Sequence, residues 1–154
     1  MHTGMTVFLL AEDDPHDAHV IEEEFAKAPA HVRLQRVRDG AEAMAYMEGR
    51  GQFAERARFP VPDVILMDLK MPRVDGHDFL HWLRHEAPEK MRVIPVIIMS
   101  TSTEEKDVNR SYEFGANSYV VKPFGWAKFQ QRIRELGIYW AEHSETPIVP
   151  DQAT

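Results

Sequence analysis

Cysteine is absent from the 154 residues of this chain, which excludes disulfide bonds, thiolate metal sites and thiol nucleophiles. A chain without cysteine fits a reducing compartment, so we expect a cytoplasmic protein. No apolar run approaches the ~20 residues that a membrane-spanning helix needs. Positive charge is scarce, because 18 Lys and Arg oppose 25 Asp and Glu for a net charge of −7. We therefore expect neither a membrane nor a nucleic acid as partner, since neutralising phosphates needs clustered cations.

The length and composition are those of one globular domain. Apolar residues make up 44% of the chain and charged residues 28%, both ordinary values for such a domain. A chain of this length can bury one sizeable core, and it contains no internal repeat or low-complexity tract. We expect one domain over residues 1–143. Residues 144–154 are polar and contain proline, which predicts a flexible C-terminal tail.

Short apolar runs recur along the chain, and each of them ends at polar residues. The clearest is VILM at 64–67, which leads directly into Asp68. A continuous run of this kind indicates a strand buried on both faces, as in parallel sheets. Similar runs predict further strands at 6–11, 32–37, 93–99 and 118–121.

Helical patterns separate these runs. Asp14 is a good N-cap and Pro15 suits a first helical turn, so a helix is expected directly after the first strand. Others are expected to begin near Asp39, Gly76, Glu104 and Phe124, and the last of them reaches about His143. Residues 50–62 are interpreted as an inserted surface loop. Alternating strands and helices predict a parallel sheet that is covered on both faces.

Reactive side chains follow several of the predicted strands. Glu12 and Asp13 follow the first, Asp68 the third, Ser100 the fourth and Lys122 the fifth. The carboxyl ends of strands in a doubly wound sheet meet at one edge, so these groups should lie together. Carboxylates ~4 Å apart repel by about 4 kcal/mol per pair at an effective dielectric near 20. A hard divalent cation removes this cost, and an all-oxygen set of few ligands suits Mg²⁺.

The same edge also suits phosphoryl transfer. Lys122 and the Ser100 hydroxyl would face an anion beside Asp68, and this chemistry needs mainly charge neutralisation and in-line placement. Structural alternatives exist for each residue. In these alternatives Asp68 is only a cap at the end of a strand, Ser100 is only a helix cap, and Tyr119, in the last predicted strand, is an ordinary core residue.

Four motifs lie at the strand ends, in the order AEDDP, VILMDLKMPRVDG, VIIMSTS and YVVKPF. Each is weak alone, but the ordered set resembles the receiver domain of two-component response regulators over residues 5–143. The resemblance implies a flavodoxin-like α/β fold with a five-stranded parallel sheet in the order 2-1-3-4-5. It also implies a protein that accepts a phosphoryl group from a histidine kinase and signals through protein contacts. Such a protein is no enzyme beyond its own phosphorylation and dephosphorylation.

The resemblance implies a role for each acid at this edge. Asp68 would be the phosphoacceptor, and Glu12 and Asp13 would be the acidic pair around Mg²⁺. The backbone carbonyl of Lys70 would be a further metal ligand. Asp68 itself would complete the metal site.

The resemblance also implies roles at the ends of the last two strands. Lys122 would be the lysine that contacts the phosphoryl group. Ser100 would be the switch hydroxyl, and Tyr119 the aromatic residue whose rotamer reports phosphorylation. The Lys122–Pro123 peptide bond would be cis, as in the family, although only about 5–6% of X–Pro bonds are cis.

The chain departs from the shortest receivers in two places, the loop at 50–62 and an extended C-terminal helix. Both features resemble the single-domain regulators that accompany bacterial phytochrome histidine kinases. The last helix carries large apolar residues at heptad-like spacing, which are Trp126, Phe129, Ile133, Leu136 and Trp140. We expect a homodimer through this helix and the fifth strand. The alternative is that the extension folds back on its own domain.

Other interpretations stay open at this point. One alternative is that the receiver is a phosphorelay intermediate or a phosphate sink. A haloacid-dehalogenase-like phosphatase also uses a strand-end aspartate, but it needs a second aspartate where this chain has Lys70. His77, His81 and His85 recur every four residues, a spacing compatible with zinc, although a solvated helix face is the simpler interpretation.

Overall fold

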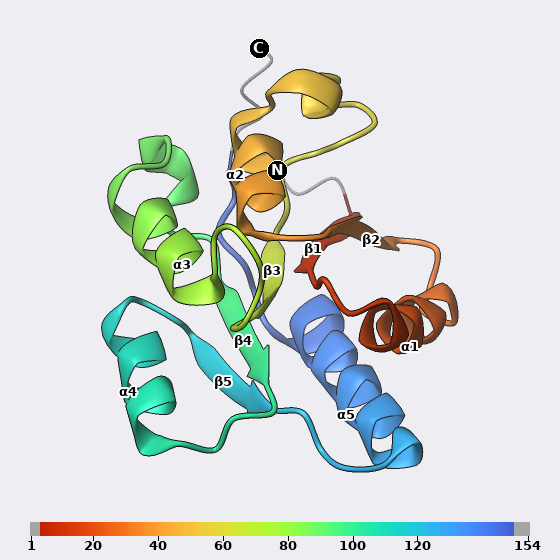
Figure 1. Cartoon of the computed structure of the whole chain (residues 1–154). Coiled ribbons are helices and arrows are strands. Elements are labelled where there is room, and N and C mark those ends of the chain that lie inside the picture. The colour runs from red at the N-terminus through yellow and green to blue at the C-terminus, as the bar shows by residue number, and fades with distance from the viewer. Residues whose placement is uncertain (1–3, 150–154) are drawn as a thin grey trace.

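The computed structural model describes residues 4–149, which form a five-stranded parallel sheet with helices on both faces (Figure 1). The strand order is β2-β1-β3-β4-β5, and every neighbouring pair is parallel. This arrangement confirms the predicted flavodoxin-like fold. The strands are β1 (Thr6–Ala11), β2 (Val32–Val37), β3 (Val64–Asp68), β4 (Val96–Ser100) and β5 (Ser118–Val121).

The helices divide between the two faces of the sheet. One face carries α1 (Pro15–Ala26) and α5 (Trp126–Ile138), which pack against each other. The opposite face carries α2 (Gly40–Glu48), α3 (Gly76–His85) and α4 (Glu105–Glu113) (Figure 1). No helix within residues 4–149 combines the length and the apolar character needed to cross a membrane.

The core consists of two clusters, one on each face of the sheet. Phe8 and Leu10 of β1 point into the cluster beneath α1 and α5. Leu9 and Ala11 point into the cluster beneath α2 and α3. Because successive residues of a strand face opposite sides, a strand buried on both faces must be apolar throughout. The edge strands β2 and β5 are mostly half-buried, which explains why their sequences are more polar.

The fourth strand begins at Val96, so the predicted start at 93 is wrong. Pro95 has no N–H to donate to a sheet ladder, and its carbonyl instead accepts the N–H of Ile65 at 2.9 Å. Val93 lies outside the sheet and is 59% exposed. The apolar run therefore continues beyond the segment that the sheet buries.

The inserted loop at 50–62 folds onto the end of α2 through a buried arginine. The Arg56 guanidinium donates to the carbonyls of Tyr46 at 2.8 Å and Met47 at 2.6 Å. It also donates to the Phe59 carbonyl at 3.1 Å within the loop itself. Arg56 thus satisfies carbonyls that the end of a helix leaves without partners.

The C-terminal helix is extended, as predicted. A π-helical segment, η3 (Tyr139–His143), continues α5 to the predicted end. Trp140 packs against the sheet, whereas Ile138 and Tyr139 are 47% and 53% exposed. Of the predicted tail, residues 150–154 lie outside the described residues, while Val149 packs against the core cluster beneath α2 and α3.

Two helical glycines differ sharply in the space around them. A Cβ on Gly76 would lie 2.6 Å from the Asp68 carbonyl oxygen, whereas one on Gly137 would lie 3.6 Å from Phe25. We expect Gly76→Ala to lower the free energy of unfolding by about 1–3 kcal/mol through overpacking. The matched change Gly137→Ala should raise it by up to about 1 kcal/mol, because alanine favours a helix. Urea denaturation measures both, and equal effects would contradict the account.

Candidate functional site

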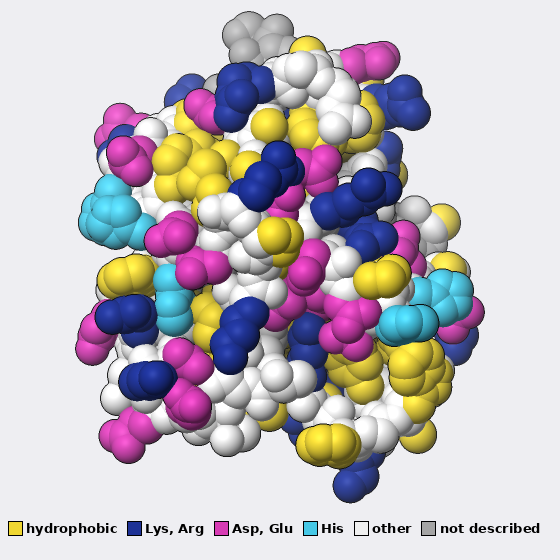
Figure 2. Space-filling view, viewed as in Figure 1, with side chains coloured by type: hydrophobic (Ala, Val, Ile, Leu, Met, Phe, Trp, Pro, Cys, Tyr) yellow, Lys and Arg dark blue, Asp and Glu magenta, His cyan; other side chains and the backbone are white. Residues whose placement is uncertain are grey.

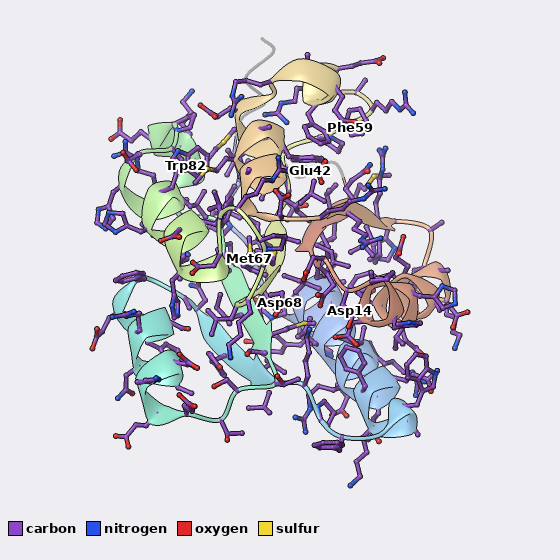
Figure 3. The ribbon with its side chains drawn as sticks, viewed as in Figure 1. Asp14, Glu42, Phe59, Met67, Asp68 and Trp82 are labelled. Carbon is purple, nitrogen blue, oxygen red and sulfur yellow. The ribbon has the colours of Figure 1, made fainter. Side chains whose placement is uncertain are left out.

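The carboxyl edge of the sheet gathers three acids. Asp68 is the last residue of β3, and Glu12 and Asp13 follow β1 directly. Figure 3 labels Asp68 at the end of its strand and Asp14 at the start of α1. Carboxylate oxygens of Glu12, Asp13 and Asp68 lie within 4.8 Å of one another. Acidic side chains accordingly gather near the centre of the face in Figure 2.

Glu12 is the buried member of this acidic group. The backbone carbonyl of Glu12 accepts hydrogen bonds from Nε and Nη2 of Arg36 at 3.2 and 3.0 Å. Its backbone N–H donates to the Val37 carbonyl. Both contacts attach it to β2. Burial, together with the nearby Asp68 carboxylate, raises the pKa of Glu12 to about 8. A buried acid beside another acid therefore needs positive charge to remain ionised at neutral pH.

Lys122 supplies positive charge from the end of β5. Its Nζ donates to Glu12 Oε1 at 2.7 Å and Asp17 Oδ2 at 2.9 Å, and it lies 3.6 Å from Asp68 Oδ2. Burial lowers the pKa of Lys122, but the charges of Glu12 and Asp68 outweigh this effect and raise it above its ordinary value. The ammonium therefore stays charged, although the side chain is only 8% exposed.

The donor set fits a hard divalent cation. All three acids offer carboxylate oxygens, and a cation of this class keeps several waters in addition to one or two protein carboxylates. Asp13 is exposed, so one side of the acidic group is open to solvent. Within residues 4–149 no other group of three ligating side chains converges so closely.

Ser100 and Tyr119 are linked through the loop that follows β4. Ser100 is buried, and its Oγ accepts the N–H of Ser102 at 3.1 Å. The Tyr119 hydroxyl donates to the carbonyl of Ser102 at 2.9 Å. The two predicted switch residues thus contact the same residue of this loop. The metal role of the Lys70 carbonyl stays a prediction, and the Lys70 side chain is exposed.

The predicted cis bond between Lys122 and Pro123 is wrong. No peptide bond within residues 4–149 is cis, so this bond is trans. The trans form is favoured by about 0.5–1 kcal/mol at X–Pro bonds.

Sequence reasoning missed two contacts near the acidic group. Asp17 carries no role in the sequence analysis, yet it contacts Lys122 from the first turn of α1. Asp39 is expected only to lie near the start of a helix; it caps α2, and it also accepts a hydrogen bond from Arg73 Nε at 3.0 Å. Arg73 has a φ of +66° and lies in the loop that follows Asp68. An acid at either position already suits the start of a helix, so neither contact leaves a further signal in the sequence.

The three histidines of α3 form no zinc site in the described part of the chain, where the acids above make up the single three-residue group. His81 and His85 are exposed, as the solvated interpretation predicts. His77 differs, because its Nε2 lies 2.9 Å from Ser111 Oγ and its ring packs against Phe114. It therefore joins α3 to α4.

Comparison with known proteins decides the family. The family model for the response regulator receiver domain matches residues 8–134. This chain belongs to that family. Receivers are signalling proteins, and phosphorylation of an aspartate is their general mechanism. Membership favours this function over the phosphatase that we considered from the sequence.

Similar receivers include two that are named for light signalling. Response regulator Rcp1 of Synechocystis sp. is 31% identical over 141 residues, 92% of each chain. The phosphorylated cyanobacterial phytochrome response regulator RcpA has a TM-score of 0.86 at 30% identity, over 94% of this chain and 99% of its own. RPA3017, in red light signalling of R. palustris, has a TM-score of 0.83 at 36% identity, over 94% and 99%. Rcp1 is also known in a Mn²⁺-bound form, with a TM-score of 0.83 at 29% identity, over 93% of this chain and 99% of its own.

The contact between Arg73 and Asp39 predicts a pH-dependent effect on stability. Burial raises the pKa of Asp39, but the Glu42 N–H and the Arg73 guanidinium outweigh it and hold this pKa below the ordinary 3.8. A depressed pKa adds stability above pH 3.8, and this stability is lost as the pH falls through the lower folded value. We expect Arg73→Gln to be less stable than wild type at pH 7, with the difference shrinking in acid.

Urea denaturation from pH 7 to below pH 3.8 measures this effect. The control is Arg50→Gln, because Arg50 forms an exposed pair with Glu48 at 2.9 Å. Exposed pairs contribute little, so this variant should match wild type throughout. A difference between Arg73→Gln and wild type that did not change with pH would contradict the assignment.

Proposed function

We propose that this receiver accepts a phosphoryl group on Asp68 from the phosphohistidine of a histidine kinase, with Mg²⁺ held by Glu12, Asp13 and Asp68. The observation that carries the proposal is the meeting of these acids within 4.8 Å, with Lys122 Nζ 3.6 Å from Asp68. The backbone carbonyl of Lys70 is proposed as a further ligand. When bound, Mg²⁺ neutralises the charge of the carboxylates and of the phosphoryl oxygens.

Asp68 and Lys122 divide the chemistry between them. A carboxylate oxygen of Asp68 attacks phosphorus, so an O–P bond forms while the P–N bond of phosphohistidine breaks. The electron pair of the broken bond remains on the imidazole nitrogen. The Lys122 ammonium, already next to Asp68, pairs with a phosphoryl oxygen and favours the transfer electrostatically.

Ser100 and Tyr119 are proposed to transmit the signal. The Ser100 hydroxyl donates a hydrogen bond to a phosphoryl oxygen, which draws this side chain toward Asp68. Ser100 also holds the N–H of Ser102, and Tyr119 holds its carbonyl, so movement of Ser100 alters the anchoring of Tyr119. Phosphorylation would then change the relative populations of the conformations of the surface formed by α4, β5 and α5.

The proposed kinase partner is a bacterial phytochrome in the cytoplasm. Support comes from the relatives named as phytochrome or red-light response regulators, which match over nearly their whole length. The Mn²⁺-bound form of Rcp1 supports a divalent ion in such receivers.

A homodimer is proposed through β5 and the last helix. β5 is an edge strand, and an unpaired edge invites pairing with another chain. Tyr139 and Trp140 lie beside β5, and Tyr139 is 53% exposed there, where a monomer would leave apolar surface in water. A second copy of the same face would cover them.

Incubation with acetyl phosphate and Mg²⁺ tests the phosphoacceptor. We expect wild type to gain one phosphoryl group by mass spectrometry, and to gain none when EDTA removes the metal. Asp68→Asn should gain none under any condition, because an amide does not replace the nucleophilic carboxylate. The control Asp78→Asn, an exposed position on α3, should behave as wild type. Phosphoryl transfer to Asp68→Asn at the wild-type rate would refute the proposal.

Light scattering tests the dimer. We expect a dimer for wild type and a monomer for Tyr139→Lys, because a buried lysine at the interface would lose its hydration. Val93→Lys is the control, since Val93 is 59% exposed and belongs to neither β5 nor the last helix. A wild-type monomer both with and without phosphorylation would exclude the dimer.

A further inference from the structure

Lys122 holds a carboxylate that the metal site does not use. Asp17 Oδ2 accepts from Lys122 Nζ at 2.9 Å, and Glu12 Oε1 accepts at 2.7 Å. A lysine ammonium has three donors, so these two acids take two of them. Asp68, at 3.6 Å, is too far for a hydrogen bond and receives only the charge of the ammonium.

Asp17 is held firmly in this position. It lies in the first turn of α1, where Asp14 caps the helix by accepting the N–H of His16 at 2.8 Å. The next residue of α1, Ala18, is fully buried. The Asp17 side chain is itself 27% exposed, so it lies at the rim of the site. An acid in the first turn of a helix interacts favourably with the helix dipole. That role does not require a contact with a lysine that follows β5.

The charges at this edge assign Asp17 a separate role from the other acids. Glu12, Asp13 and Asp68 converge on one point, and Asp17 is not part of that group. When a cation engages Glu12 and Asp68, the Asp17 carboxylate therefore remains on Lys122. Its negative charge then partly cancels the ammonium, which lowers repulsion of a cation and also weakens attraction of an anion.

We propose that Asp17 is a positioning residue that restrains Lys122, so that the resting site favours the divalent cation and opposes the phosphoryl group. The inference rests on the proposed function, because Lys122 must contact the phosphoryl oxygens. In this role Asp17 weakens the attraction of the site for a phosphoryl group. Asp17 lies on α1, whereas the other site residues lie at strand ends.

The inference predicts two opposite changes in one variant. In Asp17→Asn the size and an acceptor oxygen remain while the charge is lost. We expect its Mg²⁺ dissociation constant, measured by calorimetry, to rise roughly two- to fivefold, as for one partly exposed charge. Its dissociation constant for beryllofluoride, a phosphoryl analogue, should fall by a similar factor when Mg²⁺ is saturating. Asp17→Ser should change both constants in the same directions.

The control is Glu22→Gln, an exposed acid on the same helix, which should change neither constant. Loss of packing at the site would weaken both ligands together, so a joint weakening overturns the inference. Unchanged constants also overturn it, as does weaker beryllofluoride binding, which would mean that Asp17 directs Lys122 toward the phosphoryl group. If wild type bound no beryllofluoride, and so matched Asp68→Asn, the proposed function itself would fail.

Discussion

The structure depends on holding several carboxylates close together at the carboxyl edge of the sheet. Glu12 and Asp68 approach each other in a setting where burial already disfavours their ionised forms, and Lys122 contacts both of them and Asp17. One ammonium does not balance this many carboxylates. The net negative charge of the site therefore favours the binding of a cation.

The fold holds these charges together against their repulsion. β1 and β3 are buried on both faces, so the acids at their ends cannot move apart without disturbing both core clusters. Arg36 holds the backbone of Glu12, and the pair of Arg73 with Asp39 attaches the loop after Asp68 to α2. Gly76 allows that loop to pass close to the Asp68 carbonyl. The packing of the core thus offsets the repulsion between the acids at this edge.

The sequence predicts the strands and the acids well because both leave direct signals. Strands such as β1 and β3 appear as unbroken apolar runs, and the acids Glu12 and Asp68 follow them. The contacts of Asp17 and Asp39 leave no such signal, since helix capping and the helix dipole already explain an acid at each position. The start of β4 was misplaced because Pro95 interrupts the ladder inside an apolar run. The Lys122–Pro123 isomer was inferred from the family and did not follow from these residues.

A crystal of the protein soaked in Mn²⁺ tests the central claim most directly, through an anomalous difference map. The account predicts one strong peak within coordination distance of the carboxylates of Glu12, Asp13 and Asp68. A map whose strongest peak lay elsewhere on the protein, or that held no peak among these three carboxylates, would contradict it.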